Sequence, residues 1–255
     1  MENGVLDLPQ GFCRVFLSDS EQVDFFIRGY SNTKFSFFGW DVYLTTTHIS
    51  MIIVIATILI FAICANRAIK NADSNKVPGP FLNVIELIVE SLDGMVKSSM
   101  GTKKALVFRN YVSALFVFIL VCNLSGLLGL RPPTADFGVT FPLAIITWVM
   151  IQYNGFKHQG MGKIKALFEP IFLFFPMNLI SEFSTPVSMS LRLFGNILSG
   201  TVMMGLLYGL LPRVLTLIWP AALHAYLDVF SGCIQAYVFC MLTMSFVSDA
   251  IGDDM

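Results

Sequence analysis

Long apolar segments separated by short polar ones make up most of this chain. An apolar helix needs about 20 residues to cross the hydrocarbon core of a bilayer, and in lipid the backbone must satisfy its own hydrogen bonds. The pattern therefore predicts an all-α polytopic membrane protein with about five transmembrane helices and no internal repeat. The predicted spans are residues 42–65, 105–130, 139–153, 178–211 and 214–248.

Two further segments are apolar but unsuited to crossing. In residues 77–104 a Pro-Gly-Pro sequence breaks the chain, and the helix that follows mixes aliphatic and charged residues. This mixture is typical of an amphipathic helix at the membrane interface. Residues 166–177 contain Pro170 and Pro176, and we expect them to lie along the interface as well. The charged residues that alternate with aliphatic ones in the helix of the first segment are Glu86, Glu90, Asp93 and Lys97.

The last two spans form a predicted helical hairpin over residues 178–248, with a turn at Pro212 and Arg213. As a helix, the first arm would be about 50 Å long. Because the hydrocarbon core is only about 30 Å thick, the arm must tilt, kink near Pro186 or run partly along the surface. We therefore expect a long tilted hairpin.

Composition supports a membrane protein. The 255 residues are 55% hydrophobic and 13% charged, with a mean hydropathy of +0.72, whereas about a quarter of the residues in a soluble domain are charged. The basic residues lie in short loops and form no basic face, so the expected surroundings are a lipid bilayer, and no nucleic acid is expected as a partner. The cysteines show no paired spacing, which favours their use as small apolar residues.

Basic loop residues predict the orientation. The loops after the first and third spans carry most of the Lys and Arg residues, whereas the alternate loops carry only Arg131 and Arg213. The positive-inside rule then places the N-terminus outside and the C-terminus in the cytoplasm. Residues 1–41 lack the basic start and apolar centre of a signal peptide. We expect them to be an extracytoplasmic segment, partly ordered, before a single transmembrane domain over 42–255.

Arg192 lies near the middle of an apolar segment, an unusual place for a fixed charge. Arginine cannot release its proton as lysine can, and a charge at the centre of a bilayer costs at least about 2.5–3.5 kcal/mol. A charge kept there usually serves ion movement. We expect Arg192 to face a water-filled cavity, another helix or a passing carboxylate.

Two stripes of polar residues accompany this charge. Residues spaced three or four apart share one face of a helix, and two facing antiparallel helices would bring the stripes to similar depths. The pattern indicates an ion-channel domain with a fixed positive barrier. The stripes are Ser188, Arg192, Asn196 and Ser199 on one arm of the hairpin, and His224, Asp228, Ser231 and Gln235 on the other.

A fixed positive charge can control a mobile carboxylate. In lipid the carboxylate stays neutral by binding a proton or another cation, but beside Arg192 it can ionise, because an opposite charge favours the charged form. Arg192 would thus force ion release on one side and permit reloading on the other. It would also prevent ions from passing directly between two aqueous half-paths.

Residues 186–196, PVSMSLRLFGN, resemble the signature of subunit a of the F-type ATP synthases in its bacterial form. Residues 234–239 (IQAYVF), followed by 241–244 (MLTM), resemble the last helix of the same family. Residues 133–136 (PTAD) and 139–140 (VT) resemble its loop before the third span. The resemblance covers most of the chain from about residue 40 onward.

The resemblance implies a function. It implies a stator channel in a bacterial plasma membrane, beside a rotating ring of c subunits and the b subunits of the peripheral stalk. Ion flow through two aqueous half-channels would turn the ring, and the subunit would make no bond itself. Arg192 matches the essential arginine of the family, and Asn196 and Gln235 match its polar channel residues. The coupling ion, proton or sodium, is chosen in this family mainly by the c subunit.

The chain departs from the family at one position. Five residues past Asn196 many bacterial members carry a glutamate, and this chain has Thr201. Asp228, seven residues before Gln235, lies where relatives carry His or an acid. We expect Asp228 to supply the carboxylate of the outer half-channel. Glu182 is either part of the inner half-channel or a solvated carboxylate at the interface.

The other polar residues also have structural interpretations. Arg192 could form an ion pair with Asp228 or with the inner carboxylate, and Asp228 could be stabilised by His224. Asn196 and Gln235 could simply join helices by hydrogen bonds. His224 is expected to be structural or to lie near the outer surface rather than to relay protons.

Two other classes of protein compete with this interpretation. A secondary transporter would be self-contained and would usually show repeats around a midplane site. A purely structural membrane subunit would not need an arginine within the membrane. The sequence has no nucleotide-binding loop, metal-ligand cluster or nucleophile–base arrangement, so we expect no stand-alone enzyme, no cofactor and no bound metal.

Overall fold

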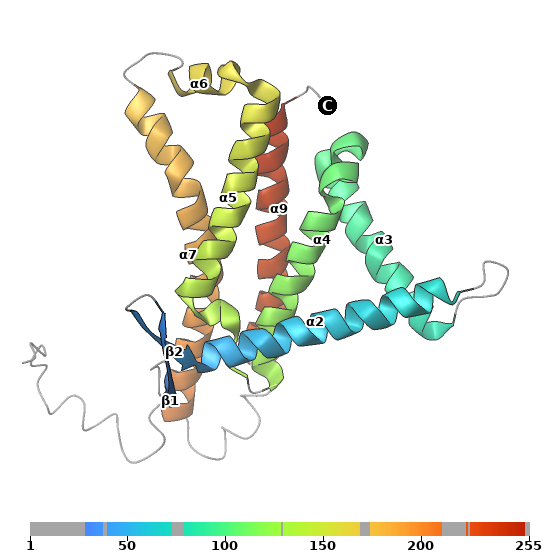
Figure 1. Cartoon of the computed structure of the whole chain (residues 1–255), viewed down its shortest axis with the longest axis vertical. Helices are drawn as coiled ribbons and strands as arrows, with labels where there is room; N and C mark the ends of the chain where they lie inside the picture. Colours follow the sequence, from blue (N-terminus) through green and yellow to red (C-terminus); the bar gives the residue numbers. More distant parts are fainter. Residues whose placement is uncertain are drawn as a thin grey trace, which may run out of the picture.

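The computed structural model describes residues 29–37, 40–72, 79–128, 130–168, 174–210, 223 and 225–252. Most of these residues are helical (Figure 1), and five of the described helices are long and apolar enough to cross a membrane. The prediction of an all-α polytopic membrane protein is confirmed. The five candidate spans are Thr46–Lys70, Thr102–Leu128, Phe137–Gln159, Phe175–Leu207 and Tyr226–Ile251.

A β-hairpin precedes the helices. β1 (Gly29–Phe37) and β2 (Trp40–Thr45) pair antiparallel, with Phe37 opposite Trp40. The prediction that the first span starts at residue 42 was therefore wrong, because that residue lies in β2. Short apolar runs rich in aromatic and β-branched residues suit a strand as well as a helix, and hydropathy alone does not separate the two.

α2 (Thr46–Lys70) is an unbroken apolar helix with Arg67 and Lys70 in its last turn, where positive charge complements the helix dipole. Figure 1 shows α2 crossing α4, α5, α7 and α9 at a steep angle. α2 and these four helices therefore cannot all run along the membrane normal. Either α2 or the group of four must be strongly inclined in the bilayer, and the length of the hairpin arms also requires inclined helices.

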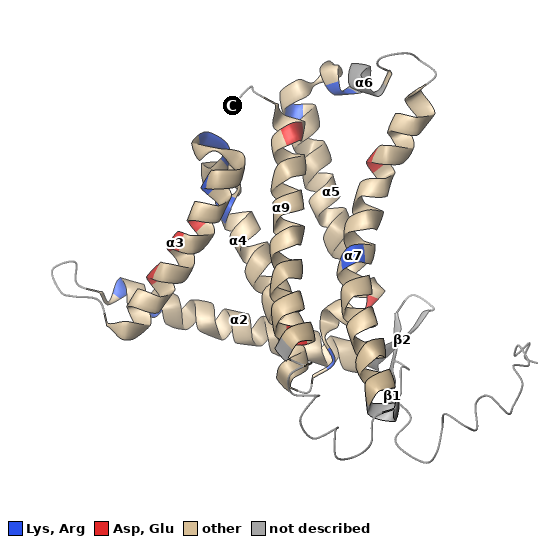
Figure 2. Cartoon of the chain, turned by 180° about the vertical axis from the view of Figure 1, so that it is seen from behind, with Lys and Arg blue, Asp and Glu red and all other residues tan. Residues whose placement is uncertain are grey.

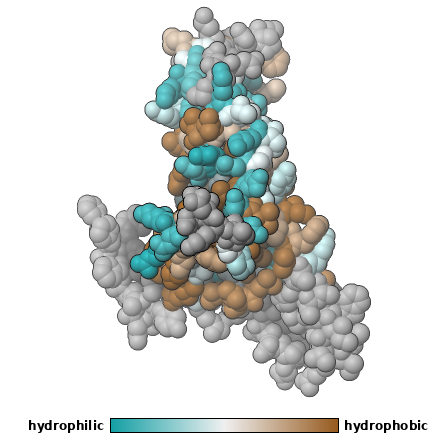
Figure 3. Space-filling model, turned by 90° about the vertical axis from the view of Figure 1, so that its right-hand side faces the viewer, coloured by the Kyte–Doolittle hydropathy of each residue, from teal (hydrophilic) through white to brown (hydrophobic). Residues whose placement is uncertain are grey.

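α3 (Pro80–Met100) begins with proline, which suits the first turn of a helix. It ends at Gly101, whose φ of 76° suits glycine. The predicted interfacial segment, 77–104, therefore ended too late, because α4 (Thr102–Leu124) starts directly after this glycine. α3 is not among the candidate spans and packs against α4. Figure 3 shows a hydrophilic band on the side of the molecule that carries α3.

Two short 3-10 helices, η1 (Ser125–Leu128) and η2 (Pro133–Ala135), lead from α4 to α5 (Phe137–Gln159). The carboxylate of Asp136 accepts a 3.0 Å hydrogen bond from the backbone N–H of Gly138. Asp136 therefore caps the start of α5.

The third span is longer than predicted. α5 ends at Gln159 rather than at residue 153. The amide of Asn154 donates a 2.8 Å hydrogen bond to the carbonyl of Met150 in the same helix, so the polar residues of its last turns do not break it. Gly160, with φ of 53°, then makes the turn into α6 (Met161–Phe168).

α7 (Phe175–Leu210) is a single helix of 36 residues that continues through Pro186. It starts slightly before the predicted residue 178, since a proline at position 176 fits a first helical turn. At 1.5 Å per residue it is about 54 Å long, which makes it the long arm that the sequence predicted.

The second arm contains a π-helix. η5 (Ala225–Phe230) is π-helical, and α9 (Ser231–Ile251) continues as an α-helix past the predicted end at residue 248. The first part of this predicted arm, residues 214–222 and 224, lies outside the described residues. α9 packs against both α4 and α5 and forms the centre of the core. Its buried apolar residues are Ala236, Phe239, Cys240, Met244, Val247 and Ile251.

Lysine-rich turns and the end of α9 lie at one end of the molecule, where Figure 2 shows basic residues at the α3–α4 turn and around α6. The ammonium group of Lys104 donates a 2.6 Å hydrogen bond to the carbonyl of Gly252 and a 3.4 Å one to that of Ser248. A cation at the C-terminus of a helix stabilises its dipole and satisfies its last carbonyls.

Candidate ion-conducting site

The two arms of the hairpin touch through residues of the two predicted stripes. α7 and α9 run antiparallel (Figure 1), and the hydroxyl of Ser231 donates a 3.0 Å hydrogen bond to Oδ1 of Asn196. Arg192 lies four residues before Asn196 on α7, and Gln235 lies four residues after Ser231 on α9. Because the helices are antiparallel, both steps run in the same direction, and each covers about 6 Å. The contact therefore sets Arg192 at about the depth of Gln235. Asn196 thus joins the two helices by a hydrogen bond, as its structural interpretation predicts.

Arg192 lies on an exposed face of α7. Its neighbours Met189 and Leu193 turn into the bundle and are buried. Within the described part of the chain, Arg192 forms no hydrogen bond or ion pair, so the proposed ion pairs with Asp228 and Glu182 are not found. In Figure 2, α7 is coloured blue partway along its length, and Arg192 is the basic residue of this helix.

Exposed apolar residues flank the polar stripe that carries this arginine. Such a face suits lipid or another membrane helix and provides no counter-charge of its own. The exposed apolar residues of α7 on either side are Val187, Leu191, Leu198, Val202 and Met203.

Gln235 is buried, with 7% of its surface exposed. Its amide nitrogen has no hydrogen-bond partner among the described residues. A buried amide group without a partner costs about 1–3 kcal/mol, so such groups in native proteins need an explanation such as water or an ion at the site. Gln235 is therefore poorly explained as a purely structural link between helices.

Asp228 lies in η5 and is half-buried. π-helical segments are rare and occur frequently at functional sites. Thr201 is exposed, and its hydroxyl donates a 2.9 Å hydrogen bond to the carbonyl of Ile197 within α7. Thr201 lies five residues after Asn196, and Asp228 lies three residues before Ser231. Measured along the helices from the Asn196–Ser231 contact, the two residues therefore differ in depth by about 3 Å. His224 and its predicted interaction with Asp228 lie outside the described residues.

A buried polar junction that the sequence analysis missed holds α9 in place. The amide of Asn123 on α4 donates a 3.0 Å hydrogen bond to the carbonyl of Gly232, and the hydroxyl of Thr134 donates a 2.9 Å one to Oδ1 of Asn123. A Cβ at Gly232 would lie 3.1 Å from the Cβ of Asn123, so glycine permits the close approach. In the sequence, the one sign of this junction is the amide side chain of Asn123 within an apolar span.

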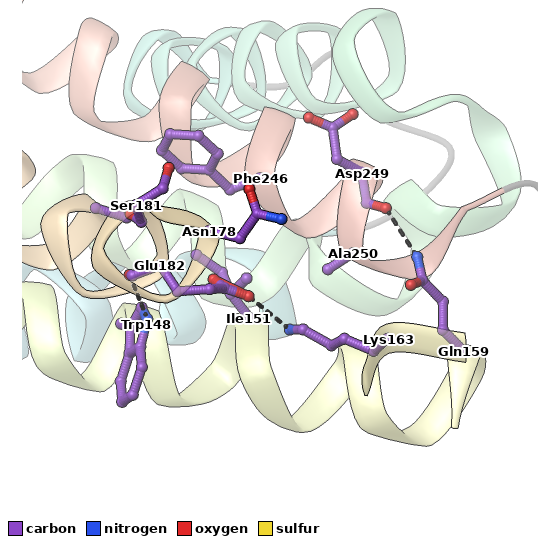
Figure 4. Close-up of a pocket in the computed structure, with 11 residues that line it drawn as sticks. Trp148, Ile151, Gln159, Lys163, Asn178, Ser181, Glu182, Phe246, Asp249 and Ala250 are labelled. Carbon is purple, nitrogen blue, oxygen red and sulfur yellow. Dashed lines mark hydrogen bonds and ion pairs between the residues drawn. The ribbon is translucent and has the colours of Figure 1, made fainter. Parts of the chain in front are cut away.

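A cavity of about 330 Å³, lined by both polar and apolar residues, opens between α5, α7 and α9, toward the end of the molecule that carries α6 (Figure 4). Glu182 is at its centre and is held from two sides. The amide of Gln152 donates a 2.9 Å hydrogen bond to Oε2 of Glu182, and the indole of Trp148 donates a 3.1 Å one to its backbone carbonyl. The Lys163 ammonium lies 3.6 Å from Oε1 of Glu182.

The polar stripe of α7 begins in this cavity. Asn178, Ser181 and Thr185 all line the cavity, and steps of three and four residues continue from them through Ser188 to Arg192. One face of α7 thus carries polar side chains over about 21 Å, from the cavity to the arginine. In the described residues no three His, Cys, Asp or Glu side chains lie close enough together to hold a metal ion.

Fold and site define a polytopic helical membrane protein whose longest helix carries an exposed arginine between a polar cavity and a polar contact with the last helix. Residues 48–248 match the ATP synthase A chain family. The chain belongs to this family, and the resemblance seen around Arg192 is confirmed.

Relatives with a curated description share substantial identity with the chain. The sodium ion specific ATP synthase subunit a of Propionigenium modestum is 38% identical over 185 residues, which are 66% of this chain and 62% of that protein. The chloroplastic ATP synthase subunit a of Stigeoclonium helveticum is 31% identical over 211 residues, 78% of this chain and 82% of that protein. The match thus spans less than two thirds of the Propionigenium protein.

Proposed function

We propose that the chain is the ion-translocating stator subunit of an F-type ATP synthase. It provides two aqueous half-channels separated by Arg192 and couples ion flow to rotation of a ring of c subunits. It works in a bacterial plasma membrane, is held by the b subunits of the peripheral stalk and catalyses no bond-forming step itself. Membership of the ATP synthase A chain family and five candidate spans support the proposal.

The observation that carries the proposal is the exposed Arg192. Its guanidinium has no ion pair within the described residues, on a helix apolar enough to cross a membrane. A permanent cation is costly there unless an anion meets it. A carboxylate on a neighbouring ring would supply that anion, and beside Arg192 it would ionise and release its ion.

The inner half-channel is the cavity around Glu182. The polar residues among its lining and the stripe that continues along α7 offer a path from the cavity to Arg192. The alternative of a solvated interface carboxylate fits less well, because Glu182 is held by Gln152 and Lys163 within the cavity.

The outer half-channel approaches Arg192 from the other direction. Asp228 supplies its carboxylate, near the level of Thr201, and Asn196 and Gln235 carry ions or water past the interhelical contact. The buried, unpartnered amide of Gln235 supports this role. His224 directly precedes η5 in the sequence and is expected to be structural or to lie near the outer surface.

The orientation follows from the positive-inside rule. Basic residues lie at the α3–α4 turn and around α6 (Figure 2), near the C-terminal end of α9, where Lys104 bonds to the carbonyl of Gly252. That end faces the cytoplasm in this proposal, so the cavity around Glu182 opens to the cytoplasm. Residues 1–41 then form an extracytoplasmic segment, and 42–255 form one transmembrane ion-channel domain.

Dependence on the ring separates this function from that of a secondary transporter. Vesicles containing this chain with the c ring and soluble head should show ATP-driven ion uptake, while vesicles with the chain alone should show none. Ion transport by the chain alone would refute the proposal and would indicate a self-contained transporter.

A further inference from the structure

Lys163 reaches from α6 into the cavity and lies where a transported cation would bind. Its ammonium donates a short hydrogen bond to Oε1 of Gln152 and lies 3.6 Å from Oε1 of Glu182. It also lies 5.4 Å from the centre of the Phe156 ring, a distance at which a cation is attracted to an aromatic face. Figure 4 shows the lysine extended toward Glu182.

This position is well enclosed. Only 11% of the Lys163 side chain is exposed, compared with 33% of the Glu182 side chain. Lysine side chains normally keep their charged end in water. Here the charged end instead points inward, and the two oxygens beside it are of the kind that a hydrated monovalent cation or a hydronium ion would use.

A glycine makes room for the lysine. A Cβ at Gly155 would lie 2.6 Å from Nζ, 2.9 Å from Cδ and 3.2 Å from Cε of Lys163. These atoms belong to the end of a flexible side chain, so alanine at this position would push the lysine aside without a clash with the backbone. The chain thus offers a way to move this charge without removing it.

We propose that Lys163 is a tethered cation that occupies the ion site at Glu182 and Gln152, and that an ion entering the inner half-channel must displace it. The proposal rests on the function proposed above. A bound ammonium competes with the entering ion for the same oxygens, so it weakens ion binding on this side. Lys163 therefore sets the affinity of the inner half-channel, and Gly155 positions Lys163.

The test uses the complete complex in vesicles with the soluble head facing the medium. ATP-driven pumping is titrated with Na⁺ at fixed pH and, in parallel, with protons in Na⁺-free buffer. For the cation that supports pumping, Lys163→Gln and Gly155→Ala should each lower the half-saturating concentration by roughly three- to tenfold, a range suited to a partly exposed charge pair. Lys163→Arg keeps the charge and should lower the half-saturating concentration less than Lys163→Gln does.

Two controls identify the contact as the cause. Lys157→Gln removes one charge from the exposed surface at the same end of α5 and should leave the half-saturating concentration unchanged. In a Glu182→Gln background, Lys163→Gln should have little further effect, because its partner is already neutral.

Wild-type half-saturation in both Lys163→Gln and Gly155→Ala would overturn the proposal, as would an equal shift in Lys157→Gln. Loss of the assembled complex in Lys163→Gln, with Lys163→Arg assembled, would also overturn it, because the lysine would then be holding α6 in place. Failure of the proposed function would give a different result: the wild-type complex would not pump ions, or the Arg192→Ala complex would still pump them.

Discussion

The Ser231 hydroxyl donates a 3.0 Å hydrogen bond to the side-chain oxygen of Asn196, and this contact sets the register of α7 against α9. Through it Arg192 and Gln235 come to about the same depth on facing helices. The arginine then lies between two polar regions, the cavity around Glu182 and the segment that carries Asp228. A path interrupted by one fixed charge is the arrangement that the proposed mechanism requires.

If this hydrogen bond fixes the register, its two partners should behave as one unit. We expect Ser231→Ala and Asn196→Ala each to slow ATP-driven pumping by roughly fivefold, as loss of about 1 kcal/mol implies. The double variant should be no slower than the slower single variant. Ser199→Ala is a suitable control, since among the described residues the Ser199 hydroxyl bonds only to a carbonyl of its own helix. Additive losses in the double variant would contradict a shared role.

Gln235 tests whether a buried amide serves ion passage or structure. Its amide nitrogen has no partner in the described part of the chain, so Gln235→Leu should not lower the thermal stability of the complex. The same variant should slow passive ion flux severalfold, because it removes a polar group from the path. Reduced stability with normal flux would mean that Gln235 joins helices and does not line the channel.

Asn123 should matter for assembly. Asn123→Leu would leave the Gly232 carbonyl and the Thr134 hydroxyl without their buried partner, at a cost of about 2 kcal/mol or more. We expect less assembled complex and a lower melting temperature. Asn154→Leu removes an amide that, in the part of the chain the structure describes, bonds only within its own helix, and it should have a much smaller effect. Equal effects of the two variants would rule out a special role for the junction.

Asp228 and Thr201 test the outer path together. Asp228→Asn should slow ion pumping, because the outer carboxylate is lost. Thr201 is exposed and about level with Asp228, so Thr201→Glu should assemble and should restore part of the pumping in the Asp228→Asn background. Wild-type pumping by Asp228→Asn alone would show that another group carries the outer path.

The sequence predicted the membrane helices and the stripes well, because apolar length and helical spacing are local properties. The predicted spans overlap the five found, and Asn196 and Ser231 meet as two facing stripes should. Local patterns did not predict the strand over residues 40–45, where an apolar β-branched run suits either structure.

The cavity was only partly foreseen. The sequence leaves Glu182 two interpretations, a part of the inner half-channel or a solvated carboxylate, and it does not distinguish Lys163 from the other basic residues after the third span. Its inward position depends on the turn at Gly160 and on the space at Gly155, two features of tertiary structure. The same holds for Asn123, whose partners are distant in sequence. Side-chain contacts between distant segments leave little trace in a single sequence.

The central claim is that Arg192 couples ion flow to the ring. The most direct test compares ATP-driven ion pumping in vesicles by wild type, Arg192→Lys and Arg192→Ala, with the c ring and soluble head shown to be present in each complex. We predict that Arg192→Ala abolishes pumping while the complex stays intact. Arg192→Lys should retain little activity, because lysine can lose its proton where arginine cannot. Sustained pumping by an intact Arg192→Ala complex would contradict the account.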